Sequence, residues 1–292
     1  MKKVLCLINP ISGGLDKSTF KSQVKKFCNQ ASFELKFVET TGENDDQMLA
    51  HQLSSEETDI LLICGGDGTI NLAVSCLQQH DIDVVSAIIP LGSANGMAKD
   101  LNIPEDIQAA LRLMTKGEVR NIDVMRVNDR YSVHLSDLGF NANLIRKFEM
   151  SGGRGKWNYA RHFFNVLQEQ SYSEYSILLN GEMLSFKAQM VAFANARRYG
   201  TGAVINPNGR LDDGMFEICI FKPYPWYALL GITWRFFTGN IHSSPYVQIV
   251  STREALVMVN PEEILQIDGE VIGSASRIEV SISNKPFPVI AG

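Results

Sequence analysis

The first half of the chain is organised around residues 60–71, which read Ile-Leu-Leu-Ile-Cys-Gly-Gly-Asp-Gly-Thr-Ile-Asn. An apolar run leads directly into a glycine-rich turn, and a helix-like segment follows over residues 72–79. This pattern predicts a buried strand, a tight loop and the start of a helix. Glycines let the backbone approach a ligand closely, and a helix N-terminus directs free N–H groups at it, which suits a phosphate.

Asp67 lies in the middle of this loop, where a bare carboxylate would repel a phosphate. The arrangement becomes favourable if a divalent cation bridges the two groups, or if the acid orients a hydroxyl. No Gly-Lys-Ser/Thr follows as in a Walker A loop, and the spacing differs from Gly-x-Gly-x-x-Gly. The loop therefore favours a metal-bound nucleoside triphosphate. The alternative is a structural turn in which Asp67 or Thr69 caps the following helix.

Composition restricts the classes of protein that need to be considered. With 292 residues, 45% apolar and 20% charged, the chain is long enough for about two globular domains. A net charge of −5 argues against a nucleic-acid partner. Five scattered cysteines without metal-binding spacing favour a reduced, cytoplasmic setting. The apolar run 4–8 is too short for a signal peptide, and no run reaches the roughly 18 residues of a membrane span.

Apolar strands and amphipathic helices alternate over the first part of the chain. This order predicts an α/β domain over residues 1–125, with a parallel sheet and helices on both of its faces. Strands are expected at 4–8, 33–38, 60–64 and 84–89, and helices at 17–29, 44–53, 72–79 and from Met97. Because ligands bind at the carboxyl ends of parallel strands, four polar loops should converge there. They are Asn9 to Gly14, Thr40, Gly65 to Asn71 and Gly92 to Asn95.

The pattern changes in the second part, which predicts an antiparallel, sandwich-like β domain over residues 126–292. A hairpin turn is expected at Asn128-Asp129 and a single helix at 158–168. The last residues are expected to be able to pack back on the first domain. Strands are expected at 174–180, 183–193, 215–221, 246–250, 255–259, 264–268 and 276–282.

Two acidic turns in this second domain are candidate sites. In the stretch 209–215, acids and carbonyls could hold a hard cation such as Mg²⁺, although an ordinary turn before a strand explains the same residues. Asp268 and Glu270 flank a glycine in an apolar context, where a carboxylate could act as general base. An ordinary hairpin turn is the alternative interpretation of that pair.

Two further stretches could contact lipid. Residues 226–237 include two of the three tryptophans and are too short to span a bilayer, so they form either a buried core helix or an interfacial one. Residues 146–161 carry five basic side chains and one acidic one. Such a loop fits an anionic membrane surface, and a solvated face explains it equally well.

Taken in order, five motifs resemble the diacylglycerol kinase catalytic-domain family, which includes bacterial lipid kinases and sphingosine kinases. The resemblance spans nearly the whole chain and implies an α/β nucleotide domain followed by a β-sandwich domain. Gly96 departs from it, because many members carry an acid at that position. The motifs are Asn9-Pro-Ile-Ser-Gly13, Gly65-Gly-Asp-Gly-Thr69, Pro90-Leu-Gly-Ser-Ala-Asn95, Leu211-Asp-Asp-Gly214 and Asp268-Gly-Glu270.

The resemblance also implies roles for individual residues. Asp67 would lie near the catalytic metal and the phosphates, and Asp268 and Glu270 would be the acid pair near the acceptor hydroxyl. Mg²⁺ would be held by Asp213 with the carbonyls of Arg210 and Met215. The expected ATP-binding residues are Asn9, Pro10, Ser12, Gly13, Thr40, Gly65, Gly66, Asp67, Gly68, Thr69, Asn71, Gly92, Ser93 and Asn95.

The expected function is therefore ATP-dependent phosphorylation of a lipid hydroxyl, with a diacylglycerol-like or long-chain-base-like acceptor. One alternative is an NAD kinase-like enzyme with a soluble acceptor, and another is a non-catalytic nucleotide or lipid sensor. We expect a cytoplasmic protein whose partner is a membrane lipid, with peripheral contact at the inner membrane face. A homodimer is one of the oligomeric states left open.

Overall fold

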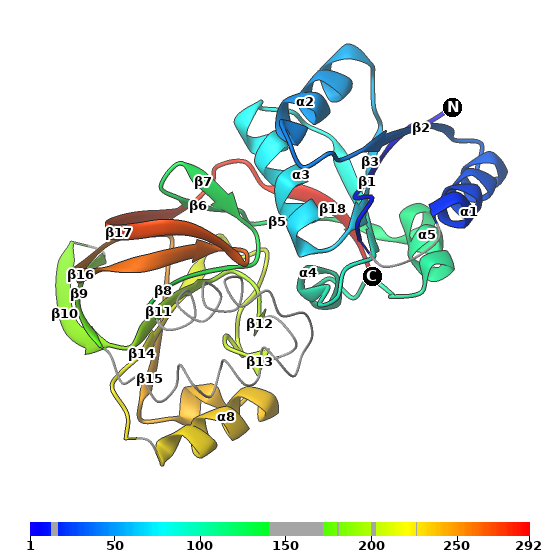
Figure 1. Ribbon diagram of the computed structural model, residues 1–292. Coiled ribbons are helices and arrows are strands. Elements are labelled where there is room, and N and C mark those ends of the chain that lie inside the picture. Colours follow the sequence, from blue (N-terminus) through cyan, green and yellow to red (C-terminus); the bar gives the residue numbers. More distant parts are fainter. Residues whose placement is uncertain (13–16, 140–171, 180, 200–202, 226) are drawn as a thin grey trace. The chain divides into compact units, whose positions relative to one another are not determined.

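The computed structural model describes residues 1–12, 17–139, 172–179, 181–199, 203–225 and 227–292. The chain divides into two compact units, drawn in Figure 1. Unit 1 consists of Met1–Val124 together with Asn284–Gly292, and unit 2 consists of Met125–Ser283. The predicted helix at 158–168 and the basic stretch 146–161 lie outside the described residues.

Unit 1 is built on a six-stranded sheet in the order β2-β1-β3-β4-β18-β5. Strands β2, β1, β3 and β4 are all parallel, and β5 runs antiparallel to β18. The central strand is buried along its whole length, as its unbroken apolar run predicts. The strands are β1 (Lys3–Ile8), β2 (Glu34–Glu39), β3 (Ile60–Gly65), β4 (Val85–Pro90), β5 (Glu118–Ile122) and β18 (Phe287–Ala291).

Helices cover both faces of this sheet, with α2 and α3 on one face and α1 and α5 on the other (Figure 1). The α/β class expected from the alternating pattern is thus confirmed. The last strand of the chain lies inside the sheet, where β18 pairs with β4 and β5. The helices are α1 (Lys17–Gln30), α2 (Asp45–Ser55), α3 (Asp67–Gln79), α4 (Gly96–Asp100) and α5 (Ile107–Lys116).

Two helix predictions in unit 1 need correction. Helix α3 begins at Asp67, five residues before the predicted start, because the N–H groups of Thr69 and Ile70 already donate to the carbonyl of Gly66. The second half of the glycine motif is therefore helical. The helix expected from Met97 is two helices, α4 and α5, with Pro104 between them. Asp106 caps α5 by accepting the N–H of Ala109 at 2.8 Å.

Unit 2 contains a large antiparallel sheet, which confirms the predicted antiparallel class. Its main path runs β15-β14-β11-β8-β16-β17-β6-β7, and β9 joins β10 to β16. The strands are β6 (Met125–Val127), β7 (Arg130–Ser132), β8 (Leu135–Gly139), β9 (Ser173–Leu179), β10 (Glu182–Ala188), β11 (Met190–Ala194), β14 (Phe216–Phe221), β15 (Val247–Thr252), β16 (Glu254–Ile267) and β17 (Glu270–Ile282). Two short strands, β12 (Arg198–Tyr199) and β13 (Ala203–Val204), pair separately.

The hairpin at Asn128-Asp129 is confirmed, since β6 and β7 pair around it and Asn128 adopts a φ of 53°. Two other strand predictions are wrong. The segment 183–193 is two strands, β10 and β11, separated by Gln189. The segments 255–259 and 264–268 belong to one long strand, β16, whose pairing with β17 shifts register between Met258 and Glu263. A bulge keeps one strand continuous where the sequence pattern is interrupted.

Helix α8 (Ala228–Thr238) packs through Ile232, which is 3% exposed, on an apolar cluster of unit 2 that includes Phe221 and Ile241. The predicted helical segment at 226–237 is thus confirmed over most of its length. A short 3₁₀ turn, η1 (Ile241–Ser243), follows it. Within the described residues, no helix combines the length and the apolar character that crossing a membrane requires.

Candidate functional site

The glycine loops of unit 1 meet at the carboxyl ends of β3 and β4, where their backbones are in direct contact. A Cβ atom on Gly92 would lie 2.6 Å from the Cα of Gly66, and one on Gly66 would lie 3.0 Å from the Cα of Gly92. A side chain at position 92 would force the two loops apart, and one at position 66 would press against the backbone of Gly92. The loops after β3 and β4, which the strand order predicts to lie side by side, are therefore held together by close contact between their backbones.

Asp67 joins these loops through its carboxylate. One oxygen accepts the N–H of Gly96 and the other accepts the N–H of Met97, each at 3.0 Å. Asp67 therefore caps α4, not its own helix α3, so the interpretation of this residue as a cap of the following helix is wrong. Each carboxylate oxygen keeps a further lone pair, which leaves room for a cation or a hydroxyl.

Asparagines fix the loops on either side. The side-chain amide of Asn9 donates to the hydroxyl of Thr69 at 3.3 Å, and its oxygen accepts the N–H of Ile11 at 3.1 Å. Asn95, with φ 51°, both accepts the N–H of Gly92 at 2.8 Å and donates to the Gly92 carbonyl at 3.0 Å. The loop after β1 is thereby tied to helix α3, and the loop after β4 is closed on itself.

The other expected ATP-binding residues occupy the same edge of the sheet. Thr40 is buried at the end of β2 and donates its N–H to the carbonyl of Ile8 at 2.9 Å. Pro10 and Ser12 follow β1, and Ser93 is exposed in the loop after β4. The remaining residues are distributed as follows: Gly65 ends β3, Gly68 and Asn71 lie in α3, and Gly13 falls outside the described residues.

The acidic turn of unit 2 follows β16. Asp268 adopts a φ of 47°, and its carboxylate accepts four hydrogen bonds from residues 132–135, where β7 ends and β8 begins. The donors are the hydroxyl of Ser132 at 2.7 Å and the N–H groups of Val133, His134 and Leu135 at 3.2, 3.3 and 2.9 Å. Burial raises the pKa of Asp268, while the neighbouring His134 and these hydrogen bonds oppose that rise. Its acceptor capacity is thus largely used inside the protein.

Glu270 differs from Asp268 although only Gly269 separates them. It is exposed at the first position of β17. Among the described residues, none forms a hydrogen bond or an ion pair with its carboxylate, so Glu270 remains accessible to a ligand. The structure thus separates two acids that the sequence pattern treats as equivalent.

The turn at residues 268–270 is supported by a buried pair, Asp137 and Gln266, that the sequence analysis did not predict. Asp137 is fully buried in β8, and one of its carboxylate oxygens accepts the side-chain N–H of Gln266 at 2.5 Å. The Gln266 oxygen in turn accepts the N–H of Gly269 at 2.6 Å. All five residues of β8 are buried, but its sequence, Leu-Ser-Asp-Leu-Gly, is too polar to have pointed to a buried acid.

The second acidic turn has the donor chemistry for a hard cation. Asp213 is exposed, and one of its oxygens accepts the N–H of Met215 at 3.1 Å, which shapes the turn. Carboxylate and carbonyl oxygens are the ligands that Mg²⁺ uses, so Asp213 and the carbonyls of Arg210 and Met215 fit it. Across the described part of the chain, no cluster of three His, Cys, Asp or Glu side chains suits a metal.

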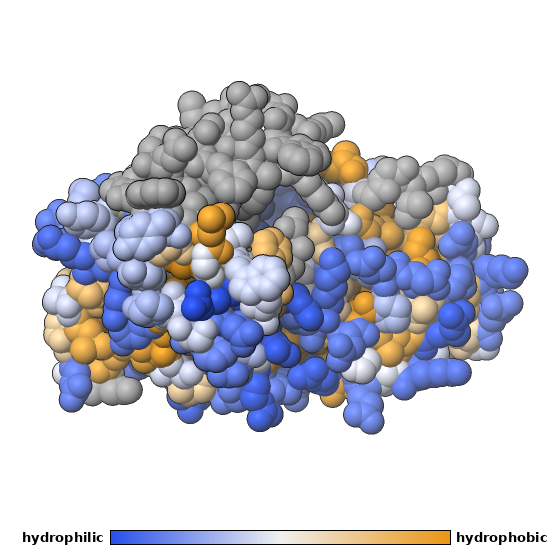
Figure 2. All heavy atoms as spheres, turned by 90° about the horizontal axis from the view of Figure 1, so that it is seen from below, coloured by the Kyte–Doolittle hydropathy of each residue, from blue (hydrophilic) through white to orange (hydrophobic). Residues whose placement is uncertain are grey.

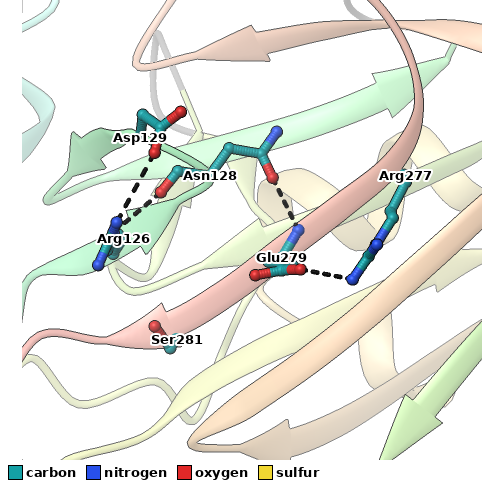
Figure 3. A pocket seen from close by; sticks show the side chains of 6 residues that line it. All are labelled: Arg126, Asn128, Asp129, Arg277, Glu279 and Ser281. Carbon is teal, nitrogen blue, oxygen red and sulfur yellow. Dashed lines mark hydrogen bonds and ion pairs between the residues drawn. The ribbon is translucent and has the colours of Figure 1, made fainter.

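An open pocket of about 460 Å³ lies on the β6, β7 and β17 side of unit 2 (Figure 3). Its charges are compensated locally, since Arg126 lies 3.7 Å from Asp129 and Arg277 lies 2.7 Å from Glu279. None of the expected site residues lines it. Its lining residues are Arg126, Asn128, Asp129, Arg277, Glu279 and Ser281.

Comparison with known proteins assigns both halves of the chain. Residues 3–127 match the family model described as the diacylglycerol kinase catalytic domain. Residues 138–286 match the one described as the YegS C-terminal NAD kinase beta sandwich-like domain.

Whole-chain relatives agree with this assignment. A diacylglycerol kinase of Bacillus subtilis is 26% identical over 94% of this chain and 91% of its own. A diacylglycerol kinase of Staphylococcus aureus is 25% identical over 93% of this chain and 87% of its own. A crystal structure of a diacylglycerol kinase from Bacillus anthracis superposes with a TM-score of 0.77, covering 100% of this chain and 97% of that one. At 21% identity it shows the shared fold alone. The two family models together span nearly all of the chain, which belongs to the diacylglycerol kinase catalytic-domain family of lipid kinases.

Proposed function

We propose that this protein transfers the γ-phosphoryl group of ATP to the hydroxyl of a lipid, with a diacylglycerol-like acceptor as the first candidate and a long-chain base as the second. The observation that carries the proposal is the junction of the two glycine loops at Gly66 and Gly92, locked by Asp67. Phosphoryl transfer depends on positioning and on stabilising charge, and a fixed, glycine-lined edge of main-chain N–H groups supplies both.

In this proposal unit 1 binds the nucleotide. The N-terminus of α3 and the loops after β1 and β4 direct N–H groups at the phosphates, and small residues let the phosphates approach the backbone. When bound, Mg²⁺ neutralises charge on the phosphoryl oxygens. Asp67 lies at this edge of the sheet, and its remaining lone pairs could bind the cation. A second set of oxygen ligands for Mg²⁺ would be Asp213 and the carbonyls of Arg210 and Met215.

Unit 2 supplies the general base, and the structure favours Glu270 over Asp268 for this role. A base must reach the proton that it abstracts, and Glu270 is exposed whereas Asp268 already accepts four hydrogen bonds. Asp268 and the Asp137–Gln266 pair then act as positioning residues that hold the turn on which Glu270 stands.

An NAD kinase-like activity is the second candidate, since the family model that matches residues 138–286 carries that description. The first experiment incubates the protein with γ-labelled ATP, Mg²⁺ and mixed micelles of candidate lipids, with NAD in a parallel reaction. Label entering the organic phase supports the lipid kinase, and the labelled species identifies the acceptor. Label on NAD would replace the first proposal by the second. ATP binding without transfer to either would leave the sensor as the remaining function.

A further inference from the structure

Helix α8 presents a continuous apolar stripe to solvent. Tyr227, Leu230, Trp234 and Phe237 are 65%, 75%, 71% and 69% exposed. At roughly 100° per residue these four side chains fall within about 80° of helix circumference, so they form one face. Figure 2 views the molecule from the side on which α8 lies in Figure 1, and pale and orange side chains form part of that surface.

The opposite face of α8 packs against the core of unit 2. Ile232 is buried, and Ala228 and Phe236 pack on the same apolar cluster of unit 2. Phe236 also stacks on Phe221 with 5.8 Å between ring centroids. The exposed stripe therefore adds nothing to the core of unit 2, and four large apolar side chains in contact with water are costly unless something covers them.

The charges around the stripe indicate what covers it. The 36 residues 218–253 contain no Asp or Glu, although 32 of the 292 residues of the chain are acidic. Lys222 and Arg235 lie in this stretch, and within the described structure neither forms an ion pair with a carboxylate. Arg235 instead donates to the carbonyl of Gly231 at 3.2 Å and to the hydroxyl of Ser243 at 3.1 Å. An acidic protein thus carries an exposed apolar helix face within a stretch of sequence that has no acid, and the basic side chains Lys222 and Arg235 of this stretch have no carboxylate partner among the described residues.

We propose that the α8 stripe, Tyr227, Leu230, Trp234 and Phe237, docks the protein on an anionic phospholipid bilayer. Tyrosine, tryptophan and basic side chains favour the headgroup region, and Leu and Phe favour the acyl boundary below it. Lys222 and Arg235, which form no ion pair with a carboxylate of the described residues, complement anionic headgroups. The inference rests on the proposed function to the extent that an acceptor dissolved in a bilayer requires the enzyme to sit on that bilayer.

The test measures co-sedimentation with vesicles that contain neither ATP nor acceptor lipid. The test variant is Leu230→Gln/Trp234→Gln, and the matched control is Met183→Gln, which changes an exposed apolar residue of β10 that is 51% exposed. With about one third phosphatidylglycerol, we expect the double variant to bind roughly tenfold or more weakly than the wild type and the control. We expect Lys222→Gln to weaken binding less, and added salt to erase that difference.

Equal vesicle binding by the wild type and the double variant overturns the proposal, as does a wild type that binds no vesicle. A double variant that loses self-association in sedimentation velocity while keeping vesicle binding also overturns it, because a second copy of the chain would then cover the stripe. Transfer to a short-chain, water-soluble diacylglycerol is measured separately, and the double variant should match the wild type there. If no variant transfers phosphate at all, the proposed function fails while the vesicle result still decides the docking surface.

Discussion

Asp67 in unit 1 and Asp268 in unit 2 are both held by main-chain N–H groups, but they acquire those donors in different ways. Asp67 takes two N–H groups from the first two residues of helix α4, 29 and 30 residues later in the chain. Asp268 takes four donors from a connection 133 to 136 residues earlier. The comparison teaches that an acid in a sequence motif can hold the backbone in place as well as take part in chemistry. The two donors of Asp67 leave acceptor capacity for a ligand, whereas the four donors of Asp268 leave little.

The largest effect is expected from Asp67→Asn. The amide keeps one oxygen for one of the two N–H groups of α4, so the fold should survive at a cost of about 1 kcal/mol. Turnover should be lost, because the substitution removes the charge that we propose to face the metal and the phosphates. Steady-state kinetics and thermal unfolding measure the two effects separately. Near-normal turnover would remove Asp67 from the mechanism and make it a purely structural cap.

Glu270→Gln should lower kcat by about 10²–10⁴-fold, the usual contribution of a general base. Its side chain is exposed, so unfolding should change by no more than about 0.5 kcal/mol. The measurement is kcat under saturating ATP together with urea unfolding of the same sample. A variant that loses stability and keeps kcat would reverse the roles assigned to Glu270 and Asp268.

Gly92→Ala tests the backbone contact at the glycine edge. The new methyl group would meet the Cα of Gly66 at 2.6 Å, and we expect a loss of about 3 kcal/mol in unfolding free energy. Gly68→Ala is the matched control, because a Cβ there meets nothing within 4 Å and the residue is helical. Alanine at that position should stabilise α3 slightly, by up to about 1 kcal/mol. Equal thermal stability of both variants would contradict the close packing of the two loops.

Asp268→Ala should cost about 2–3 kcal/mol, because it leaves the hydroxyl of Ser132 and three N–H groups without their acceptor. Asp268→Asn retains an acceptor oxygen and should recover most of that loss. Chemical unfolding of the three proteins at one pH measures the difference. If Asp268→Ala is as stable as the wild type, the carboxylate does not organise the β7–β8 connection.

The same carboxyl makes a pH dependence testable. Its pKa is raised in the folded protein, so above the usual aspartate pKa of about 4 the folded state holds a proton that the unfolded state releases. The contribution of Asp268 to stability therefore falls as the pH rises through that window. We expect this slope in the wild type and its loss in Asp268→Asn. Identical slopes would show that the pKa of Asp268 is not raised.

Strand and helix predictions succeeded where local pattern is sufficient. The apolar runs of β1, β3 and β4, each followed by a polar loop, gave the parallel order, and the turn at Asn128-Asp129 gave the hairpin. They failed where a distant partner decides. The last residues were expected to be able to pack back on the first domain, but the pattern did not predict that they form strand β18, which pairs with β4 and β5. Strand β16 stays continuous because β17 pairs with it across a bulge.

The sequence by itself determined the class of the fold, the edge of the sheet that carries the glycine loops, and the residues in the five motifs, because strand periodicity and glycine spacing are local properties. Only the tertiary structure decided what each acid contacts. In the folded protein, the carboxylate of Asp67 accepts N–H groups of helix α4, and the carboxylate of Asp268 accepts hydrogen bonds from residues 132–135. Glu270 is exposed, and the buried Asp137 bonds to Gln266. These hydrogen-bond partners lie 29 to 136 residues apart in the sequence. They meet only when the sheets form, and no local pattern encodes those contacts.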